Sequence, residues 1–282
     1  MTPPAGARPD RALPVDGAGP ATISIGPGWA AYIGPSLGLA PHRGAVTCLA
    51  VGVDGPLTVE ADGTVLVART VLVPAGLRHR VRSAGERTAF LYLDPGTAAR
   101  HGCRDRMTGA TGPLAHDHAD ETSVVASAVS GDAIALRRTA AGAGNAAGPA
   151  DPRILDALRD VRRPGGADLP TDELARRAGL SPARFRRSFA AEAGIGIRGY
   201  RRWARMIVVA QVVAAGGDLT RAAADAGFAT PSHLSHAFRQ MFGLRPSQVL
   251  DAGGRIRVRA PDDRHVRDSA AVDGRARLTP AR

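Results

Sequence analysis

The sequence contains one pattern twice, and each copy has the features of a helix-turn-helix. Gly179 and Gly227 lie 48 residues apart, and Ser181 and Thr230 lie 49 residues apart, so the second turn has one extra residue. In each copy the glycine can adopt the positive φ that ends a helix. The hydroxyl residue, which proline follows, can cap the next helix. The repeat therefore predicts two helix-turn-helix units, each with a second helix free to enter a DNA major groove.

Helical geometry divides each second helix into a buried face and an outward face. Phe185 and Phe189 are four residues apart and must share a buried face, as must Leu234 and Phe238 in the second copy. The side chains that we expect to meet DNA are Ser181, Ala183, Arg184, Arg186, Arg187, Arg201, Arg202, Thr230, Ser232, His233, Ser235, His236 and Arg239. Within that set, phosphate contacts are predicted for Arg184, Arg186, Arg201 and Arg202, and base-edge contacts for Arg187, Ser232 and His236.

Residues 151–250 resemble the AraC/XylS family of transcriptional regulators. The resemblance is carried by Ala226-Gly227-Phe228, Ser232, Leu234, Phe238-Arg239, Gly243 and Pro246-Ser247. It implies that one long helix joins the two units, so that both recognition helices enter successive major grooves on one face of the DNA. Residues 200–214 have the apolar spacing of that helix, and Gly216-Gly217 follows it. The chain departs from the family at His236, where arginine is common, and at the small Ala183.

The charge of the chain suits a polyanionic partner such as double-stranded DNA. All 37 basic residues are arginine, against 26 acidic residues, which gives a net charge of +11. A GC-rich genome would account for the missing lysines. It would not account for the cluster between Ser181 and Arg205, which holds seven arginines and the single acid Glu192. Phosphate contact explains this cluster, and a solvated charged face is the alternative.

The N-terminal half has the pattern of a β-structure. Short Val, Leu and Thr runs between residues 21 and 97 are broken by Asp54-Gly55-Pro56, Asp62-Gly63 and Pro74-Ala75-Gly76. These turns predict an antiparallel β-barrel or sandwich, with a cupin-like barrel favoured, ahead of the all-α domain, which makes the fold class α+β. Residues 72–79 resemble the second half of a cupin motif. His79 alone cannot hold a catalytic metal, so it is a weak candidate for ligand contact or a structural residue at a strand end, and no metal or cofactor is expected.

The other segments complete the predicted domain organisation. Residues 1–20 and the arginine-rich tail 251–282 are expected to be disordered, and 140–150 to form a linker. The segment 98–139 is expected to be helical and either to mediate dimerisation or to pack on the barrel. No apolar run reaches about 18 residues, so no membrane span is expected. With no signal-peptide core, the expected location is the cytoplasm.

Two functional hypotheses follow from these features. The first is a transcription regulator whose N-terminal barrel responds to a small-molecule effector or forms a homodimer, and which recruits or excludes RNA polymerase; it has no catalytic residue. The second is a DNA-binding enzyme such as an alkyl-transfer repair protein with a reactive cysteine. Cys48 lies in an apolar run and is expected to be inert, whereas the arginines around Cys103 could lower its pKa.

Overall fold

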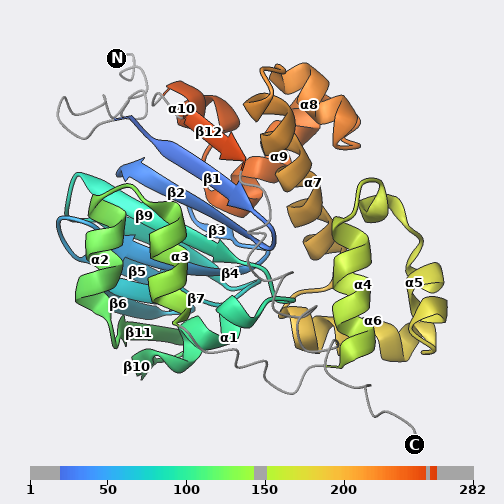
Figure 1. The fold of residues 1–282 in the computed structure, drawn as a ribbon, viewed down its shortest axis with the longest axis horizontal. Helices are drawn as coiled ribbons and strands as arrows, with labels where there is room; N and C mark the ends of the chain where they lie inside the picture. Colours follow the sequence, from blue (N-terminus) through green and yellow to red (C-terminus); the bar gives the residue numbers. More distant parts are fainter. Residues whose placement is uncertain (1–19, 143–150, 252–254, 259–282) are drawn as a thin grey trace, which may run out of the picture.

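The structure, a computed structural model, describes residues 20–142, 151–251 and 255–258. The predictions for residues 1–19, 143–150, 252–254 and 259–282 lie outside the described residues. A β-rich N-terminal half and a helical C-terminal half lie side by side (Figure 1). The α+β class predicted from the sequence is therefore confirmed.

The N-terminal half is built on two sheets. The larger sheet contains, in spatial order, β10 (Met107–Thr111), β11 (Leu114–His118), β7 (Thr70–Val73), β4 (Thr47–Gly52), β9 (Arg87–Leu93), β2 (Trp29–Pro35), β1 (Thr22–Gly26) and β12 (Arg255–Val258). The smaller sheet contains β3 (His42–Arg43), β8 (Arg78–Ser83), β5 (Leu57–Ala61) and β6 (Thr64–Ala68). Asp62 and Gly63 both have positive φ in the turn between β5 and β6, as the Asp-Gly pair predicted.

These sheets are not closed into a barrel, and of the two predicted architectures the sandwich is the one observed. Buried residues from both sheets, including Leu57 and Val59 of the smaller and Ala50 and Phe90 of the larger, share one apolar core. At one edge, β3 is only two residues long, and among the described strands it pairs with β8 alone.

Three helices cover the outer face of the larger sheet. They are α1 (Ala98–Asp105), α2 (Glu121–Val129) and α3 (Ala133–Ala141), of which α2 and α3 cross the sheet in Figure 1. Val124 and Leu136 are fully buried against Leu49 and Leu91 of the sheet. These helices thus pack on the sheet, as one of the two hypotheses for this segment predicted. The segment is not helical throughout, because residues 107–118 form the hairpin β10–β11, whose strand β11 pairs with β7.

The C-terminal half is helical and contains the predicted duplication. Its elements are α4 (Pro152–Arg162), a 3-10 turn η1 (Gly166–Asp168), α5 (Thr171–Arg177), α6 (Pro182–Ala193), α7 (Ile197–Ala214), α8 (Leu219–Asp225), α9 (Pro231–Phe242) and α10 (Pro246–Asp251). No helix among the described residues has the length and apolar character that crossing a membrane requires.

A short C-terminal strand ties the helical half to the larger sheet. After α10, β12 pairs in parallel with β1, and the Arg255 amide donates a 2.9 Å hydrogen bond to the Ala21 carbonyl. This strand lies in the tail that the sequence predicted to be disordered, so that prediction is wrong for residues 255–258. Alternate side chains of a strand face opposite sides, and Ile256 is the one that packs on the apolar core of the helical half.

Buried polar contacts also cross the junction between the halves. Asp94, at the end of β9, is fully buried and lies 2.7 Å from the Arg162 guanidinium of α4. It also accepts a 2.8 Å hydrogen bond from the Tyr200 hydroxyl of α7. Elsewhere, the Ala40 amide donates to the Gly243 carbonyl over 2.9 Å. The halves are therefore joined by specific contacts at several points.

Candidate DNA-binding surface and interdomain cavity

Both predicted helix-turn-helix turns have the expected local geometry. Gly179 has a φ of 62° and Gly227 a φ of 73°, values that favour glycine. The Ser181 hydroxyl accepts from the Arg184 amide over 3.4 Å, and the Thr230 hydroxyl accepts from the His233 amide over 3.1 Å. The sequence-predicted caps thus begin the recognition helices α6 and α9.

The apolar faces of the recognition helices are buried, and their polar faces are exposed. Phe185, Phe189 and Leu234 are fully buried, while Phe238 is partly buried. The exposed residues of the predicted set are Ser181, Ala183, Arg184, Arg186, Arg187, Arg202, Thr230, Ser232, His233, His236 and Arg239, and Ser235 is half-buried. Most of the predicted contact residues therefore lie on accessible surface.

Helix α7 sets the separation of the two units. It begins three residues before the predicted start at Tyr200 and ends at the predicted Ala214. Its 18 residues give a length of about 27 Å at 1.5 Å per residue. Since α6 precedes this helix and α9 follows it after α8, the two recognition helices belong to opposite ends of α7.

Arg187 and Arg184 are the cations on α6 that are best placed for DNA. Within the described part of the chain, neither guanidinium forms an ion pair. Arg186 lies 3.6 Å from Asp172, and both side chains are largely exposed. Such an exposed pair contributes about 0–1 kcal/mol, so a phosphate can replace the carboxylate.

Two arginines of the predicted cationic cluster serve the fold. Arg201 donates to the Leu169 carbonyl and, over 3.2 Å, to the Thr171 hydroxyl at the start of α5. Burial lowers the pKa of its guanidinium. Arg205 donates to the Gly227 carbonyl over 2.9 Å and therefore braces the second turn. The position of Arg201 thus does not support its predicted phosphate contact, because its guanidinium already donates hydrogen bonds to Leu169 and Thr171.

Gln240, on the outward face of α9, was not among the residues predicted to contact DNA. Its side-chain amide lies 2.8 Å from His236 Nε2, and its carbonyl oxygen accepts from Arg202 over 3.2 Å. Gln240 thereby links His236 of α9, a predicted base contact, to Arg202 of α7, a predicted phosphate contact. The spacing of four residues between His236 and Gln240 was the signal that could have revealed it.

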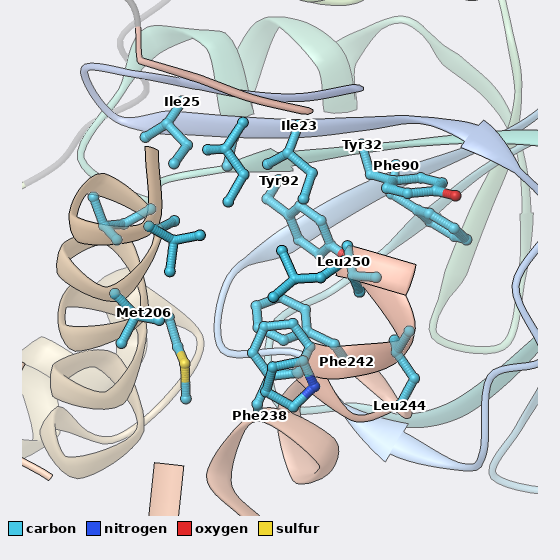
Figure 2. Close-up of a pocket in the computed structure, with 18 of the residues that line it drawn as sticks. Ile23, Ile25, Tyr32, Phe90, Tyr92, Met206, Phe238, Phe242, Leu244 and Leu250 are labelled. Carbon is cyan, nitrogen blue, oxygen red and sulfur yellow. The ribbon is translucent and has the colours of Figure 1, made fainter. Parts of the chain in front are cut away.

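An apolar cavity lies between the larger sheet and the helical half, next to the second helix-turn-helix unit. Its volume is about 130 Å³. Figure 2 shows Ile23 and Ile25 on one side, Phe238 and Phe242 of α9 on the opposite side, and Met206 of α7 at one end. The recognition helix α9 and the spacer α7 thus both contribute walls to a cavity that also touches the sheet.

His79 packs against a second histidine at the edge of the smaller sheet. The rings of His42 and His79 have centroids 4.3 Å apart, and their Nδ1 atoms donate to the carbonyls of Ala40 and Leu77. Burial lowers the pKa of both rings, to about 4 for His42, so both are neutral near pH 7. Across the residues described, no group of three or more metal-ligating side chains converges. This geometry supports the structural hypothesis for His79 over ligand contact.

Both cysteines are buried, contrary to the polar setting expected for Cys103. Cys103 is fully buried, and burial raises its pKa to about 12 despite the opposing effect of Arg106. Burial also raises the pKa of Cys48, strongly. The arginines that flank Cys103 in sequence do not lower its pKa, because the cost of desolvating a thiolate is larger.

We expect thiol reagents to modify neither cysteine of the native protein at neutral pH, because neither thiol is exposed or ionised. Modification should follow only when the protein unfolds, which mass spectrometry with and without denaturant can measure. Rapid modification of native Cys103 would instead favour the alkyl-transfer hypothesis.

Comparisons with known proteins agree with the arrangement of the helices. Residues 174–252 match the family model described as a helix-turn-helix domain. No curated protein matches the chain. Among solved structures, ToxT from Vibrio cholerae O395 is similar with a TM-score of 0.53 and 10% identity, covering 80% of this chain and 98% of ToxT.

A second ToxT structure extends the comparison. ToxT from Vibrio cholerae strain SCE256, bound to an unsaturated fatty acid, has a TM-score of 0.51 and 12% identity, covering 79% of this chain and 94% of that one. At such identities the likeness shows the fold. Together, the matched domain and the fold confirm the resemblance to the AraC/XylS family, and residues 174–252 form a helix-turn-helix domain of the AraC type.

Proposed function

We propose that this protein is a sequence-specific DNA-binding transcription regulator in which one protomer contacts two successive major grooves. A small molecule bound at the junction of its two halves modulates that contact. The regulator then recruits or excludes RNA polymerase at the promoter, and it requires no catalytic residue or cofactor.

The duplicated helix-turn-helix is the observation that carries the proposal. Two recognition helices of 12 residues each are capped, buried on one face and exposed on the other. An α-helix fits the major groove of B-DNA, and successive turns of that groove are about 34 Å apart. Because α7 joins α6 to α8 and α9 within one chain, the second recognition helix need not come from another protomer.

The two recognition helices differ in chemistry, which gives them different roles. Arg184, Arg186 and Arg187 make α6 cationic, whereas Ser232 and His236 make the outward face of α9 mostly neutral. Charge supplies affinity that does not depend on base sequence, and bidentate arginine contacts select guanine. We therefore assign most of the affinity to α6 and a weaker or finer selection to α9.

The proposed modulation rests on the cavity and on a relative with a bound ligand. Walls of the cavity come from the sheet and from α7 and α9, so an occupant touches both halves. ToxT, which has a similar fold, is described with an unsaturated fatty acid bound. An occupant that prefers one arrangement of α7 and α9 shifts the population of that arrangement.

Selection of bound duplexes from a random DNA library tests the proposal. We expect the full chain to enrich a bipartite site whose two parts lie about ten base pairs apart. Recovery of unenriched DNA, held only by salt-sensitive contacts to phosphate, would contradict sequence-specific regulation.

A further inference from the structure

We propose that the interdomain cavity binds a small, uncharged, apolar molecule and excludes carboxylates. This inference rests on the proposed function, because it names the ligand class for the same regulator. The proposed ligand class differs from that of ToxT, which has been solved bound to an unsaturated fatty acid and to a substituted butenoic acid.

The chemistry of the walls carries the inference. The described lining residues are all apolar or aromatic, and none of them carries a charge. The polar atoms on these side chains are the hydroxyls of Tyr32 and Tyr92 and the indole N–H of Trp203. The Tyr32 hydroxyl already donates to the Pro35 carbonyl over 2.7 Å. In Figure 2 it points away from the centre of the cavity.

No cation on the described walls is available to a carboxylate. On α7, Arg202 donates a hydrogen bond to Gln240. Arg205 donates to the Gly227 carbonyl and to the Asp168 carboxylate. Ile256 of β12 lines the cavity, and because alternate side chains of a strand face opposite sides, its neighbours Arg255 and Arg257 face away from it. An ionised group that loses its water without gaining a cation as its partner is strongly disfavoured, and the Tyr92 hydroxyl and the Trp203 N–H are neutral donors that supply no charge. The walls therefore select against anions.

The cavity volume limits the size of the ligand. An apolar cavity of about 150 Å³ in another protein stays dry and holds benzene. At about 130 Å³, this cavity suits a molecule close to one aromatic ring in size.

The position of the cavity couples its occupant to DNA binding. Trp203, Met206 and Ala210 of α7 and Phe238 and Phe242 of α9 all line it. A molecule held here contacts both the spacer and the second recognition helix. Filling the cavity therefore fixes how α9 sits relative to the sheet and, through α7, relative to α6.

Paired probes test the ligand class on the full chain. Toluene and benzoate have closely similar skeletons and differ in charge, and calorimetric titration measures the affinity of each. We expect benzoate to bind at least about a hundredfold more weakly than toluene. Benzoate binding as tightly as toluene, or no binding of toluene, would overturn the inference.

Matched variants of α7 place the probe in the cavity. Ala210→Leu fills space in the lining, whereas Ala214→Leu makes the same change one turn later, outside the lining. We expect toluene binding to be lost only in Ala210→Leu; unchanged binding in this variant would contradict the site. Selection of DNA by the ligand-free chain is a separate readout, so a failure of the proposed function is distinguished from a failure of this inference.

Discussion

Replacing Asp94 with alanine is expected to lower the free energy of unfolding by about 3–5 kcal/mol, because the half-buried Arg162 guanidinium loses its ion-pair partner and the buried Tyr200 hydroxyl loses its acceptor. Asp94 is fully buried, and its carboxylate contacts Arg162 over 2.7 Å and Tyr200 over 2.8 Å. Chemical denaturation of the wild type and the variant measures the difference.

Tyr200→Phe is the matched control for this substitution. It removes the hydroxyl that donates to Asp94 and keeps the ion pair with Arg162. The expected cost is about 1–3 kcal/mol, smaller than the cost of Asp94→Ala. Equal stability of Asp94→Ala and the wild type would show that the two halves are not joined through this contact.

Arg187→Ala is expected to weaken binding to the selected DNA site by about 1–3 kcal/mol, the typical contribution of a bidentate contact to guanine. Arg187 is exposed on α6 and forms no ion pair with any described residue. Its loss should therefore leave the stability of the protein nearly unchanged. Gel-shift titration against the selected site and a scrambled duplex measures the specific effect.

Arg184→Ala provides the contrast within the same helix. As a phosphate contact, Arg184 should contribute equally to selected and scrambled DNA, and its loss should reduce the salt dependence of binding. If Arg187→Ala weakens both duplexes equally, Arg187 contacts phosphate, and its assignment to a base edge is wrong.

Local chemistry explains why the helical half could be predicted from sequence. A glycine at positive φ, a hydroxyl cap and a proline at the first helical position act over only a few residues. Both turns therefore formed where Gly179 and Gly227 indicated. The spacing of Phe185 and Phe189 likewise fixed the buried face of α6, and this in turn defined the exposed side.

Features that depend on distant partners could not be predicted in the same way. Strand β12 has four residues in an arginine-rich tail, and it is a strand because the edge of β1 offers backbone partners. The charge of Arg201 gave no sign that its side chain turns back to the start of α5. The interdomain cavity arises from the docking of two halves that are far apart in sequence.

Hydroxyl-radical footprinting of the full chain on its selected site tests the central claim most directly. At concentrations where sedimentation shows a monomer, we expect two protected segments centred about 10 base pairs apart on one face of the duplex. Arg187→Ala should weaken one segment and His236→Ala the other. A single protected segment per monomer, or a second segment that appears only with dimerisation, would contradict the account that one protomer contacts two successive grooves.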